Sequence, residues 1–352
     1  MLQQAVASAN ADTEDGRSVS VCFLIQHPDL PSSRVRVLDL LPELRRHGIA
    51  ADVFSYPRTI YSKVQLFRQV RKYDVVVLQK KLPTWPDLVL LRHCAGKLYY
   101  DFDDAIYLKD SADGAARSRV RGRRFRQIVM AADRVIAGNR ILADQARRWN
   151  AAVEILPSAV ETRGIPVRQD NSSGGLTVIG WVGTAPNFQH LTAVGPVLRR
   201  VAERRSIEVR IVSNEAPELP GVPARFIRWQ RTTENAEIAA FDIGIMPLRS
   251  TPFAAGKCGY KALQYMAAGV PAVVSDVGVN SEIVRHGTDG LVVSTCEGFF
   301  DALLELIDNP DKRRRMGRQA RLRVEQEFSV ATVAQRLAHA LKTSSPAAAR
   351  LQ

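Results

Sequence analysis

Two lysines and a small-residue turn form the most chemically suggestive segment of the chain. Lys257 and Lys261 are four residues apart, so a helix that includes both would carry them on one face, with Gln264 one turn further along. A buried strand is predicted over 272–275, followed by a turn at 276–282. Helix starts and turns at such strand ends present backbone N–H groups that bind anions. The segment therefore predicts a site for a diphosphate.

Two turns are predicted to complete this diphosphate site. In the turn after 272–275, backbone N–H groups would face the diphosphate; its residues are Gly278, Val279, Asn280 and Ser281. Glu282 either caps the next helix or binds a ribose hydroxyl group. A second strand-to-helix turn carries Gly183 and Thr184 but no cation, so Arg249 or the two lysines would supply the charge.

Three carboxylates follow an apolar strand predicted over 97–101. Asp101, Asp103 and Asp104 would lie at the carboxyl end of a parallel strand, where α/β proteins keep their chemistry. Carboxylates suit Mg²⁺, and capping or loop hydrogen bonds are an alternative role.

A serine and an arginine at the first strand-to-helix turn are further candidates for a binding site. Ser33 and Arg34 follow the apolar run at 19–26. Arg34 could reach a bound phosphate, whereas the structural alternative is a helix cap and a surface arginine.

The stretch around the lysines resembles the nucleotide-binding segment of retaining GT-B glycosyltransferases, the glycosyl transferases group 1 set (family 4). The resemblance rests on Tyr-Met-Ala-Ala-Gly-Val-Pro at 265–271, Ser-Asp-x-Gly-x-x-x-Glu at 275–282 and His-Gly-Thr-Asp-Gly-Leu-Val at 286–292. The family's two glutamates, which contact the sugar and the ribose, correspond to Gly256 and Gln264. The Gln264 amide can still bind a ribose hydroxyl group, whereas Gly256 has no side chain. The resemblance implies no cofactor and no metal. It also implies that Asp103 or Asp104 binds an acceptor hydroxyl group. Ser33 and Arg34 would then lie on the acceptor side, with Arg34 reaching towards a donor phosphate or the acceptor.

Strands that alternate with helices predict an α/β fold. With the resemblance, the expected fold is GT-B: two Rossmann-like domains that face each other across a cleft, with parallel sheets and helices on both faces. Helical spacing is also expected over 34–47. The expected divisions are a disordered leader (1–17), an acceptor domain (18–160), a linker (161–175), a donor domain (176–328) and a C-terminal helix that packs back on the first domain, plus a tail (329–352).

The chain is strongly basic, with a net charge of +13 over 352 residues. Such a balance favours anionic partners. The densest basic run, Arg117–Arg126, has six arginines in ten residues. It is interpreted as a docking surface for anionic lipid or a phosphorylated acceptor, or as a solvated helix face. Nucleic acid is disfavoured because no aromatic residues are interleaved.

The sequence favours a cytoplasmic protein. It has four widely spaced cysteines, no apolar run long enough to span a membrane and no signal peptide. The protein would be peripheral on the inner membrane face if the basic run binds lipid.

Three functions are compatible with these features. The first is a retaining transferase that moves a sugar from a nucleoside-diphosphate sugar to a hydroxyl group of a glycan or lipid-linked acceptor, in polysaccharide, glycolipid or envelope glycan synthesis. In this hypothesis Asp103, Asp104, Lys257 and Lys261 serve catalysis. The second is a non-catalytic nucleotide-sugar-binding or scaffold protein, which Gly256 and Gln264 favour. The third is another GT-B enzyme, such as a nucleotide-sugar epimerase.

Overall fold

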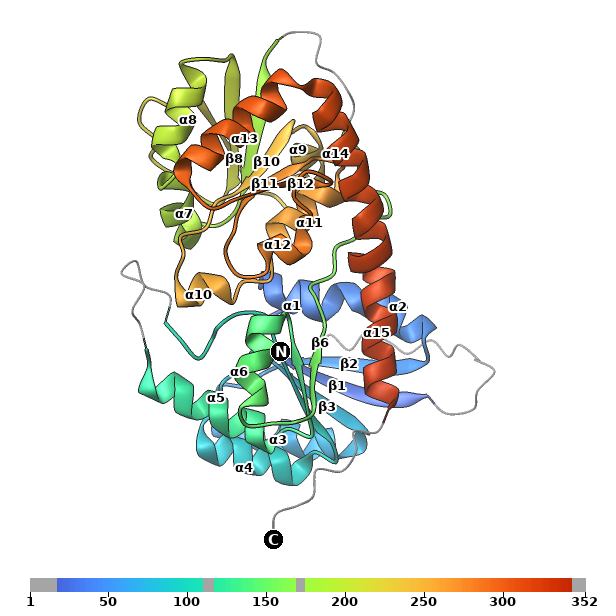
Figure 1. Cartoon of the computed structure of the whole chain (residues 1–352). Coiled ribbons are helices and arrows are strands. Elements are labelled where there is room, and N and C mark those ends of the chain that lie inside the picture. Colours follow the sequence, from blue (N-terminus) through green and yellow to red (C-terminus); the bar gives the residue numbers. More distant parts are fainter. Residues whose placement is uncertain (1–17, 110–116, 169–174, 344–352) are drawn as a thin grey trace. The chain divides into compact units, whose positions relative to one another are not determined.

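The chain forms two compact units (Figure 1). The structure, a computed structural model, describes residues 18–109, 117–168 and 175–343. Unit 1 takes in 1–159 and 330–352, and unit 2 takes in 160–329. The expected leader over 1–17 and part of the expected linker lie outside the described residues.

Unit 1 is built on a six-stranded parallel sheet. Its strands are β1 (Val19–Ile25), β2 (Ile49–Ser55), β3 (Val75–Gln79), β4 (Leu98–Phe102), β5 (Arg134–Ala137) and β6 (Val153–Ile155). Their order across the sheet is β2-β1-β3-β4-β5-β6, so the chain reverses direction once, after β2. Strands β3 and β4 are buried throughout, as expected for a sheet covered on both faces.

Helices cover both faces of this sheet. Right-handed crossovers place the helices between β1 and β2 on one face and those after β2 on the other. The first group is α1 (Pro31–Arg36), a 3₁₀ turn (Leu38–Leu40) and α2 (Leu41–Arg46); the second is α3 (Ile60–Gln69) with a 3₁₀ turn (Val70–Lys72), α4 (Trp85–Cys94), α5 (Arg119–Ala131) and α6 (Arg140–Arg147).

The last helix, α15 (Val330–Lys342), packs against α2 and belongs to the core of unit 1. Its buried Val333, Leu337 and Leu341 join the cluster that contains Leu44 and Phe23. Apolar residues recur along α15 at helical spacing, so one face of the helix is buried.

Unit 2 repeats the architecture on a second parallel sheet. Its order is β12-β11-β10-β7-β8-β9. The strands are β7 (Thr177–Val182), β8 (Ile207–Ser213), β9 (Ala224–Arg228), β10 (Ile243–Met246), β11 (Ala272–Ser275) and β12 (Gly290–Val293). The helical elements are a 3₁₀ turn (Ala185–Asn187), α7 (Phe188–Thr192), α8 (Gly195–Ala202), α9 (Glu234–Ala239), α10 (Pro252–Ala255), α11 (Tyr260–Ala267), α12 (Asn280–Ile283), α13 (Cys296–Asp308), α14 (Pro310–Arg323) and a π-helical turn (Val324–Phe328).

Two glycines let large rings lie directly on the strands of unit 2. A Cβ at Gly180 of β7 would lie 1.9 Å from the Phe241 ring, and one at Gly244 of β10 would lie 2.4 Å from the Tyr265 ring. The Tyr265 hydroxyl then accepts from Val182 N and donates to the Ile245 carbonyl. Helix α11 is thereby fixed against the ends of β7 and β10.

These two sheets with helices on both sides confirm the predicted α/β class with two Rossmann-like domains. The single helix expected over 34–47 is wrong in detail. Helix α1 ends at Arg36, its C-cap Val37 has a φ of −132°, and α2 starts afresh with Pro42 in its first turn. Proline has no N–H to donate to the preceding turn, so it favours a helix start there.

Candidate functional site

The two lysines lie at the carboxyl end of β7, but they come from different local structures. Helix α11 begins at Tyr260, so Lys261 is on the helix and Lys257 is in the loop before it. The expectation that both share one helix face is therefore wrong. Gly259, with a φ of +63°, turns the chain between them.

Each lysine points to the β7 region. Lys257 Nζ donates to Asn187 Oδ1 at 3.2 Å, and Asn187 belongs to the turn after β7. Lys261 Nζ lies 5.6 Å from the ring centroid of Trp181 in β7. Lys257 thus contacts the turn after β7, while Lys261 lies over the ring of a β7 residue, so both ammonium groups lie near the carboxyl end of this strand.

A buried histidine lies among these cations and had not been identified from the sequence. His190 of α7 is 3% exposed, and its Nδ1 accepts from the backbone N–H of Arg249 at 3.2 Å. Burial, together with the charges of Lys257, Lys261 and Arg249, lowers the pKa of His190 from 6.5 to about 4. The imidazole is therefore neutral at pH 7, with the proton on Nε2 because Nδ1 is an acceptor. Neutral His190 therefore acts on the two lysines as a dipole and not as a charge.

The Gly183 and Thr184 turn is the place where Asn187 is fixed. Asn187 Nδ2 donates to Thr184 Oγ1 at 3.0 Å, and Ala185 N donates to Asn214 Oδ1 at the same distance. A Cβ at Gly183 would lie 2.3 Å from the Trp181 ring, so only glycine fits this turn. The turn therefore fixes Asn187, whose Oδ1 accepts the hydrogen bond from Lys257.

The turn at 278–282 packs directly on the lysine segment. Gly278 has a φ of +67°, and a Cβ there would lie 2.5 Å from the Ala255 carbonyl oxygen. Val279 is the N-cap of α12, which consists of Asn280, Ser281, Glu282 and Ile283. Asn280 Nδ2 donates to the Ser275 carbonyl at the end of β11. The turn is therefore held at the strand end. Within it, Asn280 N donates to the Val277 carbonyl at 3.4 Å, and Glu282 N donates to the Val279 carbonyl at 3.0 Å.

The remaining predicted donor residues differ in exposure. Gly256 is the buried C-cap of α10, and Gln264 of α11 is 8% exposed. Arg249 lies shortly after β10, which ends at Met246, and its side chain is exposed. Glu282 is exposed as well, while its carbonyl accepts from Arg323 Nη2.

In unit 1, the predicted acidic residues surround a lysine that the sequence analysis did not single out. Lys80 directly follows β3, and its Nζ lies 2.9 Å from Asp103 Oδ1 and also pairs with Asp104. Burial would lower the pKa of Lys80, but the two carboxylates outweigh it and raise that pKa above its ordinary value. Lys80 also has a φ of +56°, a rare conformation for a residue with a side chain, which marks strain often found at functional sites.

The third acid of this run has a structural partner. Asp101 is buried in β4, and Arg36 donates to it through Nε at 3.2 Å and through Nη2. Arg36 Nη1 also donates to the Leu156 carbonyl at 2.6 Å. Burial raises the pKa of Asp101, and Arg36 opposes that rise. This ion pair joins α1 to β4.

Ser33 and Arg34 both lie in α1, near the same sheet edge. Ser33 is fully buried and its Oγ is 3.4 Å from Gln79 Oε1, whereas Arg34 is half-buried. In the described ranges, no three His, Cys, Asp or Glu side chains come together in a way that could hold a metal ion. The same ranges contain no helix with the length and apolar character to cross a membrane.

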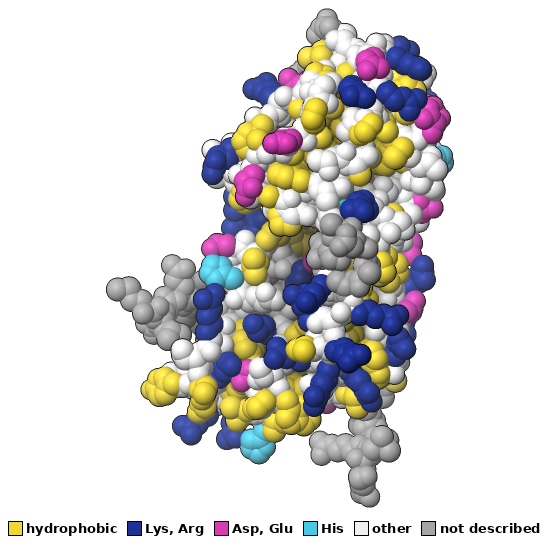
Figure 2. Space-filling model, turned by 90° about the vertical axis from the view of Figure 1, so that its left-hand side faces the viewer, with side chains coloured by type: hydrophobic (Ala, Val, Ile, Leu, Met, Phe, Trp, Pro, Cys, Tyr) yellow, Lys and Arg dark blue, Asp and Glu magenta, His cyan; other side chains and the backbone are white. Residues whose placement is uncertain are grey.

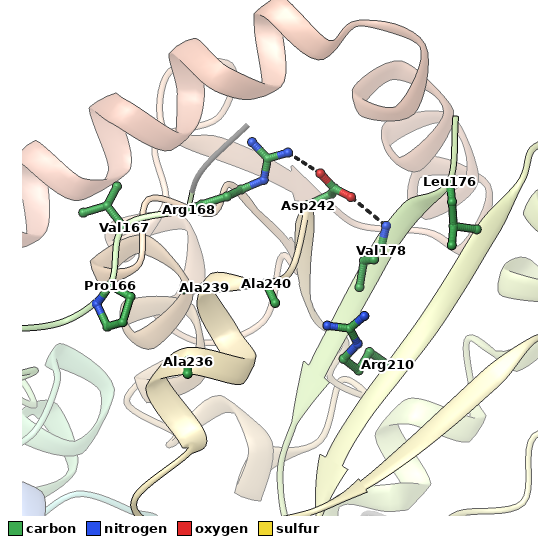
Figure 3. Close-up of a pocket in the computed structure, with 10 residues that line it drawn as sticks. All are labelled: Pro166, Val167, Arg168, Leu176, Val178, Arg210, Ala236, Ala239, Ala240 and Asp242. Atoms are coloured by element: carbon green, nitrogen blue, oxygen red, sulfur yellow. Dashed lines mark hydrogen bonds and ion pairs between the residues drawn. The ribbon is translucent and has the colours of Figure 1, made fainter. Parts of the chain in front are cut away.

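A separate cavity of about 420 Å³ lies in unit 2 away from the predicted donor residues (Figure 3). At its edge Arg168 points to Asp242 and pairs with it, and Asp242 Oδ2 accepts from Val178 N at 2.8 Å. Arg313 Nη2 lies 3.5 Å from the same carboxylate. Asp242 thus has two cationic partners, which indicates a structural clamp. The cavity is lined by Pro166, Val167, Arg168, Leu176, Val178, Arg210, Ala236, Ala239, Ala240 and Asp242.

Part of unit 2 matches a known protein family. Residues 177–309 match the family model described as "Glycosyl transferases group 1". The match lies within unit 2 and contains every predicted donor residue from Gly183 to Glu282.

Similar proteins of known sequence match shorter stretches. Over 75 residues the chain is 31% identical to spore coat protein SA of Bacillus subtilis, covering 20% of each protein. Over 110 residues it is 34% identical to the GDP-mannose-dependent monoacylated alpha-(1-6)-phosphatidylinositol monomannoside mannosyltransferase of Corynebacterium glutamicum. That alignment covers 30% of this chain and 29% of the relative. The matched stretches thus span less than a third of either relative.

The likeness of the fold extends over almost the whole chain. The structure of Anabaena HepE, solved with UDP and glucose, superimposes with a TM-score of 0.69 at 15% identity, covering 92% of this chain and 99% of HepE. Together with the two Rossmann-like units, this likeness identifies the fold as GT-B, the architecture of a large class of glycosyltransferases.

Proposed function

We propose that this protein is a retaining glycosyltransferase that moves a sugar from a nucleoside-diphosphate sugar to a hydroxyl group of a glycan or lipid-linked acceptor. The observation that carries the proposal is the convergence of Lys257, Lys261 and Arg249 on the carboxyl end of the unit 2 sheet. These cations lie inside the stretch that matches the glycosyl transferases group 1 model. A polysaccharide, glycolipid or envelope glycan pathway and a cytoplasmic location belong to the same proposal.

The proposed chemistry follows from where negative charge develops. When the bond between sugar and phosphate breaks, the leaving diphosphate gains charge, and fixed cations stabilise that state more than the bound substrate. Lys257, Lys261 and the N–H groups at 279–281 supply this field. The leaving phosphate accepts the proton of the acceptor hydroxyl group, so no protein nucleophile is needed.

Unit 1 supplies the acceptor side of the proposal. Asp103 and Asp104 bind an acceptor hydroxyl group, and Lys80 fixes the two carboxylates. Arg34 and Ser33, in α1 after β1, belong to the same side. Carboxylate oxygens held in place by an ammonium group can also accept hydrogen bonds from sugar hydroxyl groups.

The base and the sugar of the donor are left open. HepE was solved with UDP and glucose, whereas the name of the Corynebacterium relative specifies GDP-mannose. The two relatives thus differ in both the base and the sugar, so each donor has to be tested on this chain.

A non-catalytic nucleotide-sugar-binding protein is the second candidate. It is favoured by Gly256 and Gln264, which occupy the positions of the two glutamates that the resemblance assigns to sugar and ribose. Such a protein would bind a donor without turning it over.

Release of free nucleoside diphosphate distinguishes the two candidates. UDP-glucose and GDP-mannose would be incubated with the chain and a mixture of glycan acceptors, and the free diphosphate measured over time. We expect time-dependent release that Lys257→Ala with Lys261→Ala abolishes. The matched control is Lys72→Ala with Lys342→Ala, which removes two exposed lysines of unit 1. Binding of a donor without release would favour the second candidate.

A further inference from the structure

Large apolar side chains are exposed at the starts of three helices in unit 1. Ile60 and Tyr61 open α3 with exposed fractions of 80% and 72%. Trp85 opens α4 at 57%, and Val120, the second residue of α5, is 61% exposed. Isolated exposed apolar residues are normal, but a group at corresponding positions of neighbouring helices marks an interaction site.

The topology brings these four side chains to one edge. Each helix follows a strand of the parallel sheet, β2, β3 or β4, so each begins at the carboxyl edge. Helix α4 contacts both α3 and α5. Lys63 of α3 also pairs with Asp87 of α4 at 2.8 Å, which fixes the first two starts side by side. We call Ile60, Tyr61, Trp85 and Val120 the apolar rim.

Helix α5 adds a positively charged stripe beside the rim. Arg119, Arg123 and Arg126 are spaced by four and three residues, so they share one exposed helix face, and exposed Met130 continues it. Within the described part of the chain these three arginines have no acidic partner. The first turn of α5 carries no acidic residue either, and the helix is capped by the neutral Ser118, whose Oγ accepts from Arg121 N. No negative charge in that turn therefore offsets the positive helix end.

The surface view is consistent with this composition. Figure 2 shows the visible face of the lower unit covered mainly by dark-blue and yellow side chains, with little magenta. A face that combines exposed cations with apolar and aromatic side chains fits a partner that is anionic at its surface and apolar just below it.

We infer that the apolar rim and the arginine stripe of α5 dock unit 1 onto an anionic lipid bilayer. The arginines would lie at the lipid headgroups, where each contributes to binding. Trp85 and Tyr61 are residue types that favour the membrane interface, and Ile60 and Val120 would insert shallowly. The aliphatic members Ile60 and Val120 offer no stacking surface for bases, so they favour a bilayer over nucleic acid. The inference stands independently of the proposed reaction.

Vesicle flotation with the full chain tests this inference. We expect the chain to float with phosphatidylcholine vesicles that contain phosphatidylglycerol and not with vesicles of phosphatidylcholine alone. The triple variant Arg119→Glu, Arg123→Glu and Arg126→Glu should bind about 100-fold more weakly or worse. The matched control, Arg225→Glu with Arg315→Glu and Arg318→Glu, makes the same charge change on exposed arginines of unit 2 and should bind as the parent does.

The apolar part is tested separately. Ile60→Ser with Trp85→Ser should reduce the binding that persists when salt screens the charges, because salt weakens electrostatic attraction and leaves apolar insertion. Thermal unfolding of each variant checks that it is folded. Equal binding to neutral and anionic vesicles, equal loss in the control triple, or binding to a single-stranded oligonucleotide but to no vesicle would overturn the inference.

Discussion

His190 provides a quantitative test of the electrostatics of the donor site. Its folded-state pKa is about 4 against 6.5 for an ordinary histidine, a difference of about 2.5 pH units. The folded state binds this proton less readily than the unfolded state. The contribution of His190 to the free energy of unfolding is therefore fully present above about pH 7, and it is lost as the pH drops from about 6.5 to about 4. Each pH unit of difference is worth 1.36 kcal/mol, so the loss at about pH 4.5 is about 2.5 kcal/mol.

The perturbation is His190→Gln, read by denaturant unfolding at neutral pH and at about pH 4.5. Glutamine keeps an acceptor for the Arg249 N–H but does not titrate. Carboxylates also titrate in this range, so the quantity of interest is the difference between parent and variant. The variant should lose about 2 to 3 kcal/mol less than the parent on acidification. His93→Gln, at an exposed position, is the control.

A bound diphosphate should raise the pKa of His190. Its negative charges would offset Lys257 and Lys261, which are two of the causes of the depressed pKa. The pKa of His190, followed by NMR of the imidazole protons, should therefore rise on saturation with the cognate diphosphate. The reasoning is refuted if the parent and His190→Gln lose equal stability on acidification, or if a tightly bound diphosphate leaves the histidine pKa unchanged.

Three further predictions concern residues that support the two sites. Lys80→Met should lower the free energy of unfolding of unit 1 by about 3 kcal/mol in urea, since it leaves the Asp104 carboxylate and its neighbour without a buried cation; unchanged stability would contradict the ion-pair assignment. Gly180→Ala should cost about 1 to 3 kcal/mol in the same assay, because its Cβ would overlap the buried Phe241 ring, and a neutral result would contradict this packing. Asp242→Asn should lower the unfolding temperature of unit 2, because Asp242 neutralises two arginines, and an unchanged temperature would show that the clamp is dispensable.

The fold was largely predictable from sequence because its signals are local. Buried strands such as 75–79 read as continuous apolar runs, and each alternates with a helix at regular spacing. Boundaries were less predictable. The break between α1 and α2 depends on Pro42 and on how Val37 packs, and helical spacing continues across it.

The site was predictable as a segment, while its partners were not. The motif around Lys257 and Lys261 identified the segment, but spacing alone placed both lysines on one helix. The positive φ of Gly259 prevents that, and a lone glycine does not reveal its φ.

His190 and Lys80 were missed for a common physical reason. Each becomes notable only through neighbours distant in the chain: Arg249 and the lysines for His190, and two aspartates for Lys80. A signal did exist for Lys80, since Gln79-Lys80 ends an apolar strand at the edge where chemistry is expected.

The central claim is that unit 2 binds a nucleoside diphosphate through Lys257 and Lys261. Thermal unfolding in the presence of UDP, GDP, ADP or dTDP tests it most directly, because a ligand at a hundred times its Kd adds about 2.7 kcal/mol of stability. We predict stabilisation by one of the four that the double lysine variant loses and the Lys72→Ala, Lys342→Ala control retains. No stabilisation by any of them, or equal stabilisation of the double lysine variant, would contradict the assignment of this site.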